Sequence, residues 1–125
     1  MKTETNKLAG AALDWAVAKC EGHEIDSLMG GAVWYWLKCS LTGAPEVVEV
    51  FRPSSDWSFG GPILEREKIS VKYFPDGGHP NGGEWWAYWD ADPQIESYGE
   101  TPLIAALRCY VQSRQGDAID VPPNL

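Results

Sequence analysis

Histidine and cysteine are scarce in this chain, which has two histidines and three cysteines among 125 residues. The histidines, His23 and His79, are widely separated, and no cysteine stands at a zinc-ligand spacing from either. The cysteines are odd in number and form no Cys-x-x-Cys pair, which is typical of reduced thiols. We therefore expect no metal site, no bound cofactor and no disulfide.

Long apolar runs are also missing. No stretch reaches the roughly eighteen apolar residues that a membrane-spanning helix needs, and the polar residues 2–7 do not resemble a secretion signal. We expect a protein of the cytoplasm with no membrane contact.

Positive charge is in short supply, because 10 Lys and Arg face 18 Asp and Glu and the formal net charge is −8. Direct nucleic-acid binding is disfavoured, since lysine and arginine must neutralise the phosphates. An acidic surface that mimics nucleic acid remains open, although the acidic residues are spread along the chain from Glu4 to Asp120.

Recognisable catalytic motifs are absent as well. The chain has no Gly-x-Ser-x-Gly elbow. The glycine-rich residues 77–83 lack the Gly-Lys-Ser/Thr ending of a phosphate loop. In residues 65–68 an arginine, Arg66, stands where a nuclease motif needs a carboxylate. We therefore rank an enzyme below a binding protein.

Two helices with apolar stripes are predicted near the ends of the chain. Residues 5–21 form the first, with Thr5 or Asn6 as its cap, and residues 101–115 form the second. Thr101 caps the second helix, and the proline after it suits the first helical position.

Alternating apolar residues predict a strand pair between these helices. Residues 69–74 and 84–89 form an antiparallel pair, and residues 46–52 form a further short strand. Residues 23–43 are expected to be irregular, with room for a strand, and residues 117–125 to be an extended tail. The fold class is α+β: one domain with a small antiparallel sheet packed against an N-terminal and a C-terminal helix.

Tryptophan is abundant, with seven in the chain, and Trp57 stands out because it lies in an irregular stretch. Pro62 predicts a short helix over residues 62–66, and the amides at Gly60 and Gly61 would then be free to hold an anion. The Trp57 ring can stack on a base beside that anion, and Arg66 can pair with it. These residues favour a small anionic, nucleotide-like ligand.

Three blocks together resemble the NinX-like family of phage proteins. They comprise residues 13–18 with 21–22, residues 56–57 with 60–66, and residues 101–106 with Arg108. The resemblance implies an accessory protein of a tailed phage, acting in the bacterial cytoplasm, without an established activity. It adds Asp14 and Thr101 to the candidate residues.

The expected ligand-binding set is Asp14, Trp57, Gly60, Gly61, Arg66 and Thr101. One interpretation is that all of them except Arg66 converge on one cleft that binds a small anionic host ligand. The other is that Asp14 is an exposed acid at the edge of the apolar stripe. The alternative is an acidic module that binds a host protein and inhibits or redirects it. A deep pocket at Trp57 would favour the ligand, and a flat apolar or acidic face would favour the protein. The sequence leaves the oligomeric state open.

Overall fold

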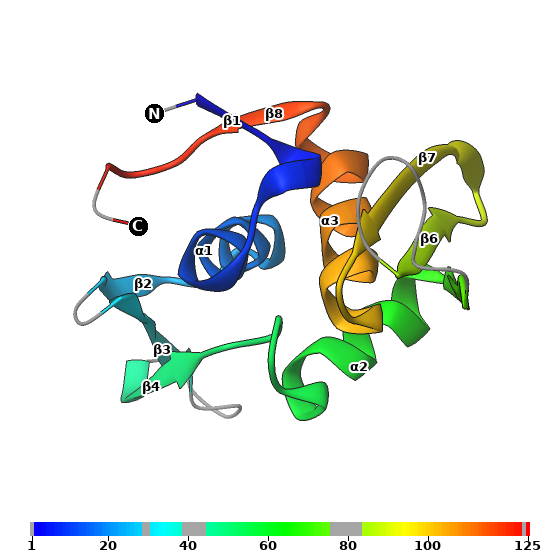
Figure 1. Ribbon diagram of the computed structural model, residues 1–125. Helices are drawn as coiled ribbons and strands as arrows, with labels where there is room; N and C mark the ends of the chain where they lie inside the picture. Colours follow the sequence, from blue (N-terminus) through cyan, green and yellow to red (C-terminus); the bar gives the residue numbers. More distant parts are fainter. Residues whose placement is uncertain (1, 29–30, 39–44, 76–83, 124) are drawn as a thin grey trace.

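The computed structural model describes residues 2–28, 31–38, 45–75, 84–123 and 125 (Figure 1). In chain order the elements are β1 (Lys2–Glu4), the 3-10 turn η1 (Thr5–Lys7), α1 (Gly10–Glu21), β2 (Ile25–Ser27), β3 (Val33–Lys38), β4 (Pro45–Phe51), α2 (Trp57–Glu67), β5 (Ile69–Tyr73), β6 (Trp85–Trp89), β7 (Asp92–Gly99), α3 (Pro102–Gln115) and β8 (Ala118–Asp120). The described strands form three antiparallel sheets, β1-β8, β2-β3-β4 and β5-β6-β7. The predicted α+β class is confirmed.

The helix α3 is the centre of the molecule. Its buried residues are Leu103, Ala105, Ala106, Leu107, Cys109, Tyr110 and Val111. The sheet β5-β6-β7 packs along it, and α1 and α2 also contact it (Figure 1). The predicted C-terminal helix, α3, lies on the predicted sheet. The predicted N-terminal helix, α1, instead packs against α3 and β3.

The start of α3 follows the sequence prediction. Thr101 is the N-cap, and its Oγ1 accepts a hydrogen bond of 3.1 Å from the amide of Ile104. Pro102 occupies the first turn, and the helix stops at Gly116. The predicted strand pair is also confirmed, with a register from Ile69 opposite Trp89 to Tyr73 opposite Trp85.

The N-terminal helix starts later than predicted, at Gly10, and neither Thr5 nor Asn6 caps it. Thr5 is buried, and its hydroxyl donates to the carbonyl of Gly116 at 3.1 Å. Thr5 lies near the end of α3 because the preceding strand, β1, pairs with β8. The predicted tail is thus partly a strand, and Val121 beyond it is buried.

The middle helix differs most from the prediction. It runs over Trp57–Glu67 instead of residues 62–66, so Pro62 lies inside it. Asp56 is the N-cap, with its Oδ1 accepting from the amide of Ser58 at 2.9 Å. Capping and burial of Ile63 outweigh the poor helix propensity of two glycines and a proline.

Two further predictions can be compared only in part. The strand predicted at residues 46–52 is confirmed as β4, and the region 23–43 contributes β2 and β3. The glycine-rich residues 77–83, with His79, and also Cys39 lie outside the described residues. Cys20 and Cys109 are unpaired, as expected.

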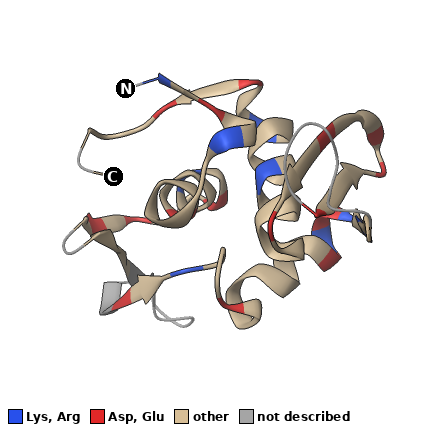
Figure 2. Ribbon diagram, in the orientation of Figure 1, with Lys and Arg blue, Asp and Glu red and all other residues tan. Residues whose placement is uncertain are grey.

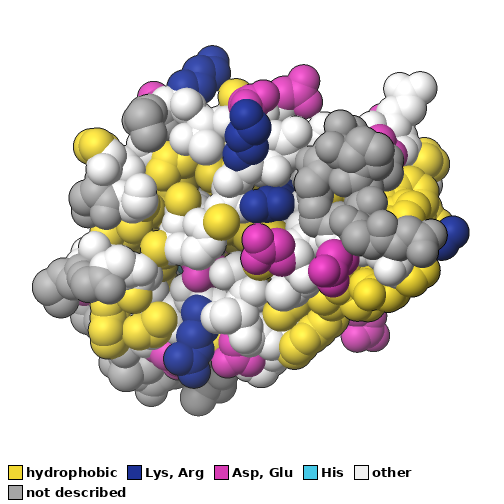
Figure 3. Space-filling view, in the orientation of Figure 1, with side chains coloured by type: hydrophobic (Ala, Val, Ile, Leu, Met, Phe, Trp, Pro, Cys, Tyr) yellow, Lys and Arg dark blue, Asp and Glu magenta, His cyan; other side chains and the backbone are white. Residues whose placement is uncertain are grey.

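Charged side chains are dispersed over the molecule. Aspartate and glutamate occur on helices, strands and turns rather than on one element (Figure 2). Acidic and basic side chains are scattered over the visible face, whereas hydrophobic side chains gather in groups at its sides (Figure 3). Among the helices described, none is long and apolar enough to cross a bilayer.

Candidate functional site

Trp57 is the first residue of α2, and 53% of its surface is exposed. Its ring leans along the helix over Gly61, where a Cβ would lie 3.7 Å from Trp57 Cε3. An indole with this exposure contributes little to the hydrophobic core. Core packing therefore does not explain why a tryptophan stands at position 57.

The amide of Gly60 is not free, because α2 begins three residues before it. It donates to the carbonyl of Asp56 at 3.0 Å. Gly60 is buried, and a Cβ on it would lie 2.6 Å from Leu103 Cδ2 and 2.7 Å from the carbonyl oxygen of Pro53. The prediction of an anion site on free amides at Gly60 and Gly61 is therefore wrong, and Gly60 allows α2 to approach α3 closely.

Asp14 is a buried acid on α1, and its Oδ1 accepts a 2.8 Å hydrogen bond from the amide of Ser54. Burial raises the pKa of Asp14, and the hydrogen bonds from the Ser54 backbone and side chain only partly oppose this. The carboxyl therefore holds the turn that leads into α2.

Substitution of Asp14 should separate its charge from its hydrogen bond. Asp14→Ala leaves a buried amide without its partner and should lower the free energy of unfolding by about 1–3 kcal/mol. Asp14→Asn keeps an acceptor and should stay close to wild type at neutral pH. Because the pKa of Asp14 is raised in the folded state, the wild type should gain stability relative to Asp14→Asn as the pH falls towards 4. Urea unfolding of both variants between neutral and acid pH tests this, and equal losses for both would contradict it.

Two of the expected site residues, Asp14 and Gly60, contact the same turn at residues 53–54, which forms a packing junction. Asp14 binds Ser54, whose neighbour Pro53 faces Gly60. Gly60 in turn faces Leu103, two residues after the α3 cap Thr101. The junction holds α1, α2 and α3 together, and its contacts are those of a core.

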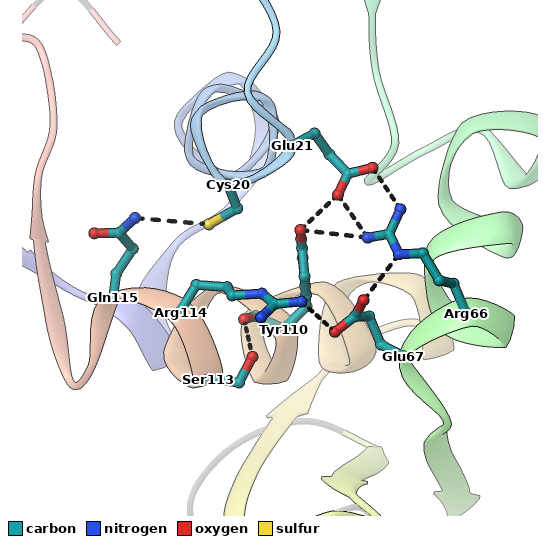
Figure 4. A network of polar contacts seen from close by, with 8 residues as sticks. All are labelled: Cys20, Glu21, Arg66, Glu67, Tyr110, Ser113, Arg114 and Gln115. Atoms are coloured by element: carbon teal, nitrogen blue, oxygen red, sulfur yellow. Dashed lines mark hydrogen bonds and ion pairs between the residues drawn. The ribbon is translucent and has the colours of Figure 1, made fainter.

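Arg66 is not beside Trp57. Nine residues of α-helix separate them, a rotation of about 180°, so they lie on opposite sides of α2. The Arg66 guanidinium donates to Glu21 Oε1 at 3.0 Å and Oε2 at 2.6 Å, and to Glu67 Oε2 at 2.8 Å (Figure 4). Two carboxylates already satisfy the charge that an anionic ligand would need.

The same network joins the C-terminal ends of α1 and α2 to α3 (Figure 4). The Tyr110 hydroxyl donates to Glu21 Oε2 at 2.5 Å, and Arg114 Nη2 donates to Glu67 Oε1 at 2.6 Å. The sequence did not predict this network, because its members are 44 to 95 positions apart where they bridge different helices. Only the spacing of charges at helix ends hints at it.

The titration of this network indicates a structural role. Burial raises the pKa of Glu21, but hydrogen bonds from Arg66 and Tyr110 and the Arg66 charge outweigh burial and lower it overall. Burial and Glu21 raise the pKa of Tyr110. Glu21 is therefore ionised and Tyr110 protonated at neutral pH, and neither is poised to exchange a proton.

His23 lies in an aromatic cluster at the β2-β3-β4 sheet. Its ring centroid is 4.8 Å from those of both Tyr35 and Phe51, and Phe59 of α2 packs on Phe51 at 5.4 Å. Burial lowers the pKa of His23, although Glu21 opposes this. The histidine is thus a neutral packing residue at pH 7. No group of three metal-ligating side chains was found within the described residues.

A hollow of about 190 Å³ lies at the junction of η1, β7 and the end of α3. Its lining residues are Glu4, Thr5, Asn6, Glu96, Gln112 and Asp117. Three carboxylates line it, so an anion would be repelled there.

Comparison with known proteins gives the family. Residues 4–114 match the family model described as Bacteriophage P22, NinX. The chain belongs to this NinX family. The match runs from β1 almost to the end of α3 and confirms the resemblance carried by the three sequence blocks. No curated protein matches the chain.

Proposed function

We propose that this NinX-family chain is a protein-binding module that docks on a host protein through Trp57. The observation that carries the proposal is the exposure of the indole, 53%, on a helix whose Phe59, Ile63 and Leu64 pack against the core. Tryptophan is enriched among the residues that contribute most of the binding energy at protein interfaces.

The charge of the chain indicates the chemistry of the partner. A net charge of −8 favours approach to a basic surface. Because the acidic side chains are dispersed (Figure 2), they steer association and do not form a nucleic-acid replica. The expected partner presents an apolar pocket bordered by lysine or arginine, into which Trp57 inserts.

A small anionic ligand stacked on Trp57 is the second candidate, and the exposed ring is the observation that favours it. Its anionic part finds less support. The Asp56 carboxylate occupies the N-terminal end of α2, and Arg66 is held by glutamates on the opposite side of the helix. The protein partner therefore fits the geometry better.

Replacing Trp57 tests whether its side chain serves partner binding rather than the stability of the fold. Trp57→Ala should change the melting temperature little, because the ring is largely exposed, but should weaken partner binding at least about 30-fold, as expected of an interface hot spot. Trp57→Tyr, which keeps an aromatic ring, should retain most of the affinity. Host proteins enriched on wild type relative to Trp57→Ala would be identified by quantitative mass spectrometry, and the purified partner measured by calorimetry.

The two candidates give different results in a thermal-shift panel of nucleotides. The protein-binding function predicts no rise in melting temperature with any nucleotide. A rise that Trp57→Ala abolishes would replace it with the small-ligand function. Equal partner affinity of wild type and Trp57→Ala would contradict the role of Trp57.

A further inference from the structure

The strand β5 is an edge of the sheet β5-β6-β7, and within the described residues only β6 pairs with it. The amide of Phe74 donates to the carbonyl of Glu84 at 2.8 Å. Because hydrogen bonding alternates along an antiparallel strand, the backbone groups of Ser70 and Lys72 also face β6. Those of Ile69, Val71 and Tyr73 therefore point outward.

Two of the three exposed side chains of this strand are apolar, and the third belongs to Lys72. Val71 is 36% exposed and Tyr73 46% exposed, and with Trp57 they are the large hydrophobic side chains that the described surface exposes. Hydrophobic side chains also gather at the side of the molecule where β6 and β7 lie (Figures 1 and 3). Proteins normally protect such an edge, because it is a template for another strand.

We propose that a second copy of this chain pairs with the outer edge of β5, antiparallel and about a two-fold axis through Val71. Each outward residue then meets an outward residue, because Val71 faces Val71 of the second copy and Ile69 faces Tyr73. Both residues of each pair can exchange their amide and carbonyl hydrogen bonds. The two sheets join into one.

Neighbouring registers fit less well. An axis through Lys72 sets the two lysines opposite each other and pairs Ile69 with Pro75, which has no amide hydrogen. An axis through Ser70 places Tyr73 opposite Glu67, where the chain is already helical. The Val71 register is the one that uses the whole strand.

Charge complementarity supports the same register. Lys72 faces Ser70 of the second copy, and the Ser70 hydroxyl donates to Asp90 Oδ1 at 3.1 Å. Opposed side chains on one face of a sheet are near neighbours, so Lys72 reaches the Asp90 carboxylate of the second copy. The two-fold axis creates this pair twice.

Sedimentation velocity of the wild type tests the association. The strand has five residues, so we expect a small interface and a mass that rises from 13.8 kDa towards twice that value between about 1 and 200 µM, as weak interfaces do. Val71→Lys places two charges on the axis and should give a monomer. At about 1 µM, where the wild type is also a monomer, its melting temperature should stay close to that of the wild type, because Val71 is 36% exposed and the lysine stem can extend to solvent. A wild type that stays monomeric throughout, or a Val71→Lys variant that still dimerises, would overturn the proposal.

A charge swap tests the register. Lys72→Glu and Asp90→Lys should each weaken the dimer about tenfold, because each sets like charges together, and the double variant should recover it. Lys19→Glu changes the net charge as Lys72→Glu does, but on an exposed site of α1, and should leave the dimer unchanged. Failure of the double variant to recover would exclude this register. Trp57→Ala should dimerise like the wild type, so this result is independent of host-protein binding.

Discussion

Gly60→Ala should lower the free energy of unfolding by about 2 kcal/mol or more, whereas Gly61→Ala should raise it by about 0.5–1 kcal/mol. A Cβ on Gly60 would lie 2.6 Å from Leu103 Cδ2 and 2.7 Å from the carbonyl oxygen of Pro53. The side chain can rotate away, but the carbonyl belongs to the backbone, so α2 must move from the turn held by Asp14.

Gly61 is the matched control, because it is the next residue of the same helix. Its nearest neighbour is Trp57 Cε3 at 3.7 Å, an ordinary contact, so alanine there adds only its better helix propensity. Chemical denaturation of the two variants measures the difference. Equal effects would show that α2 does not pack against Pro53 and Leu103 as described.

Glu21→Gln should lower the free energy of unfolding by about 1.5–3 kcal/mol at neutral pH, the usual value of hydrogen bonds to a charged group. Glu21 accepts from Arg66 at 2.6 and 3.0 Å and from Tyr110 at 2.5 Å. The variant loses the charge that holds α1, α2 and α3 together at their ends.

This loss should depend on pH with a known sign. The pKa of Glu21 is lowered in the folded state, so its contribution is fully present above its ordinary value of 4.5 and is lost as the pH falls through the folded value. The difference between wild type and Glu21→Gln should therefore shrink below pH 4.5. Glu65→Gln, an exposed site on α2, is the control and should change stability by less than about 0.5 kcal/mol. A difference that stays constant down to pH 3 would contradict an ionised Glu21.

The sequence predicted those elements that are specified by residues within the element itself. Thr101 and Pro102 specify the start of α3 through a cap and a fixed φ angle, and alternation over residues 69–74 specifies β5. The start of α2 could not be predicted in this way. Pro62 suits a first helical turn, but Asp56 caps the helix six residues before Pro62, so α2 begins at Trp57.

The candidate site shows the same limit. The sequence places Asp14 among the expected ligand-binding residues, but its carboxyl accepts a hydrogen bond from Ser54, which is 40 residues away. Arg66 is predicted to pair with an anionic ligand, whereas in the structure it forms ion pairs with Glu21 and Glu67. The exposure of Trp57 depends on how the rest of α2 packs, and only the structure shows it.

Photo-crosslinking in host cells tests most directly whether Trp57 is the centre of a protein-binding surface. A benzophenone amino acid would replace either Trp57, where its aromatic rings take the place of the indole as tyrosine does, or the exposed Glu65 on the same helix. The account predicts one discrete adduct with a host protein at position 57 and none at position 65. No adduct at position 57, or the same adducts at both positions, would contradict it.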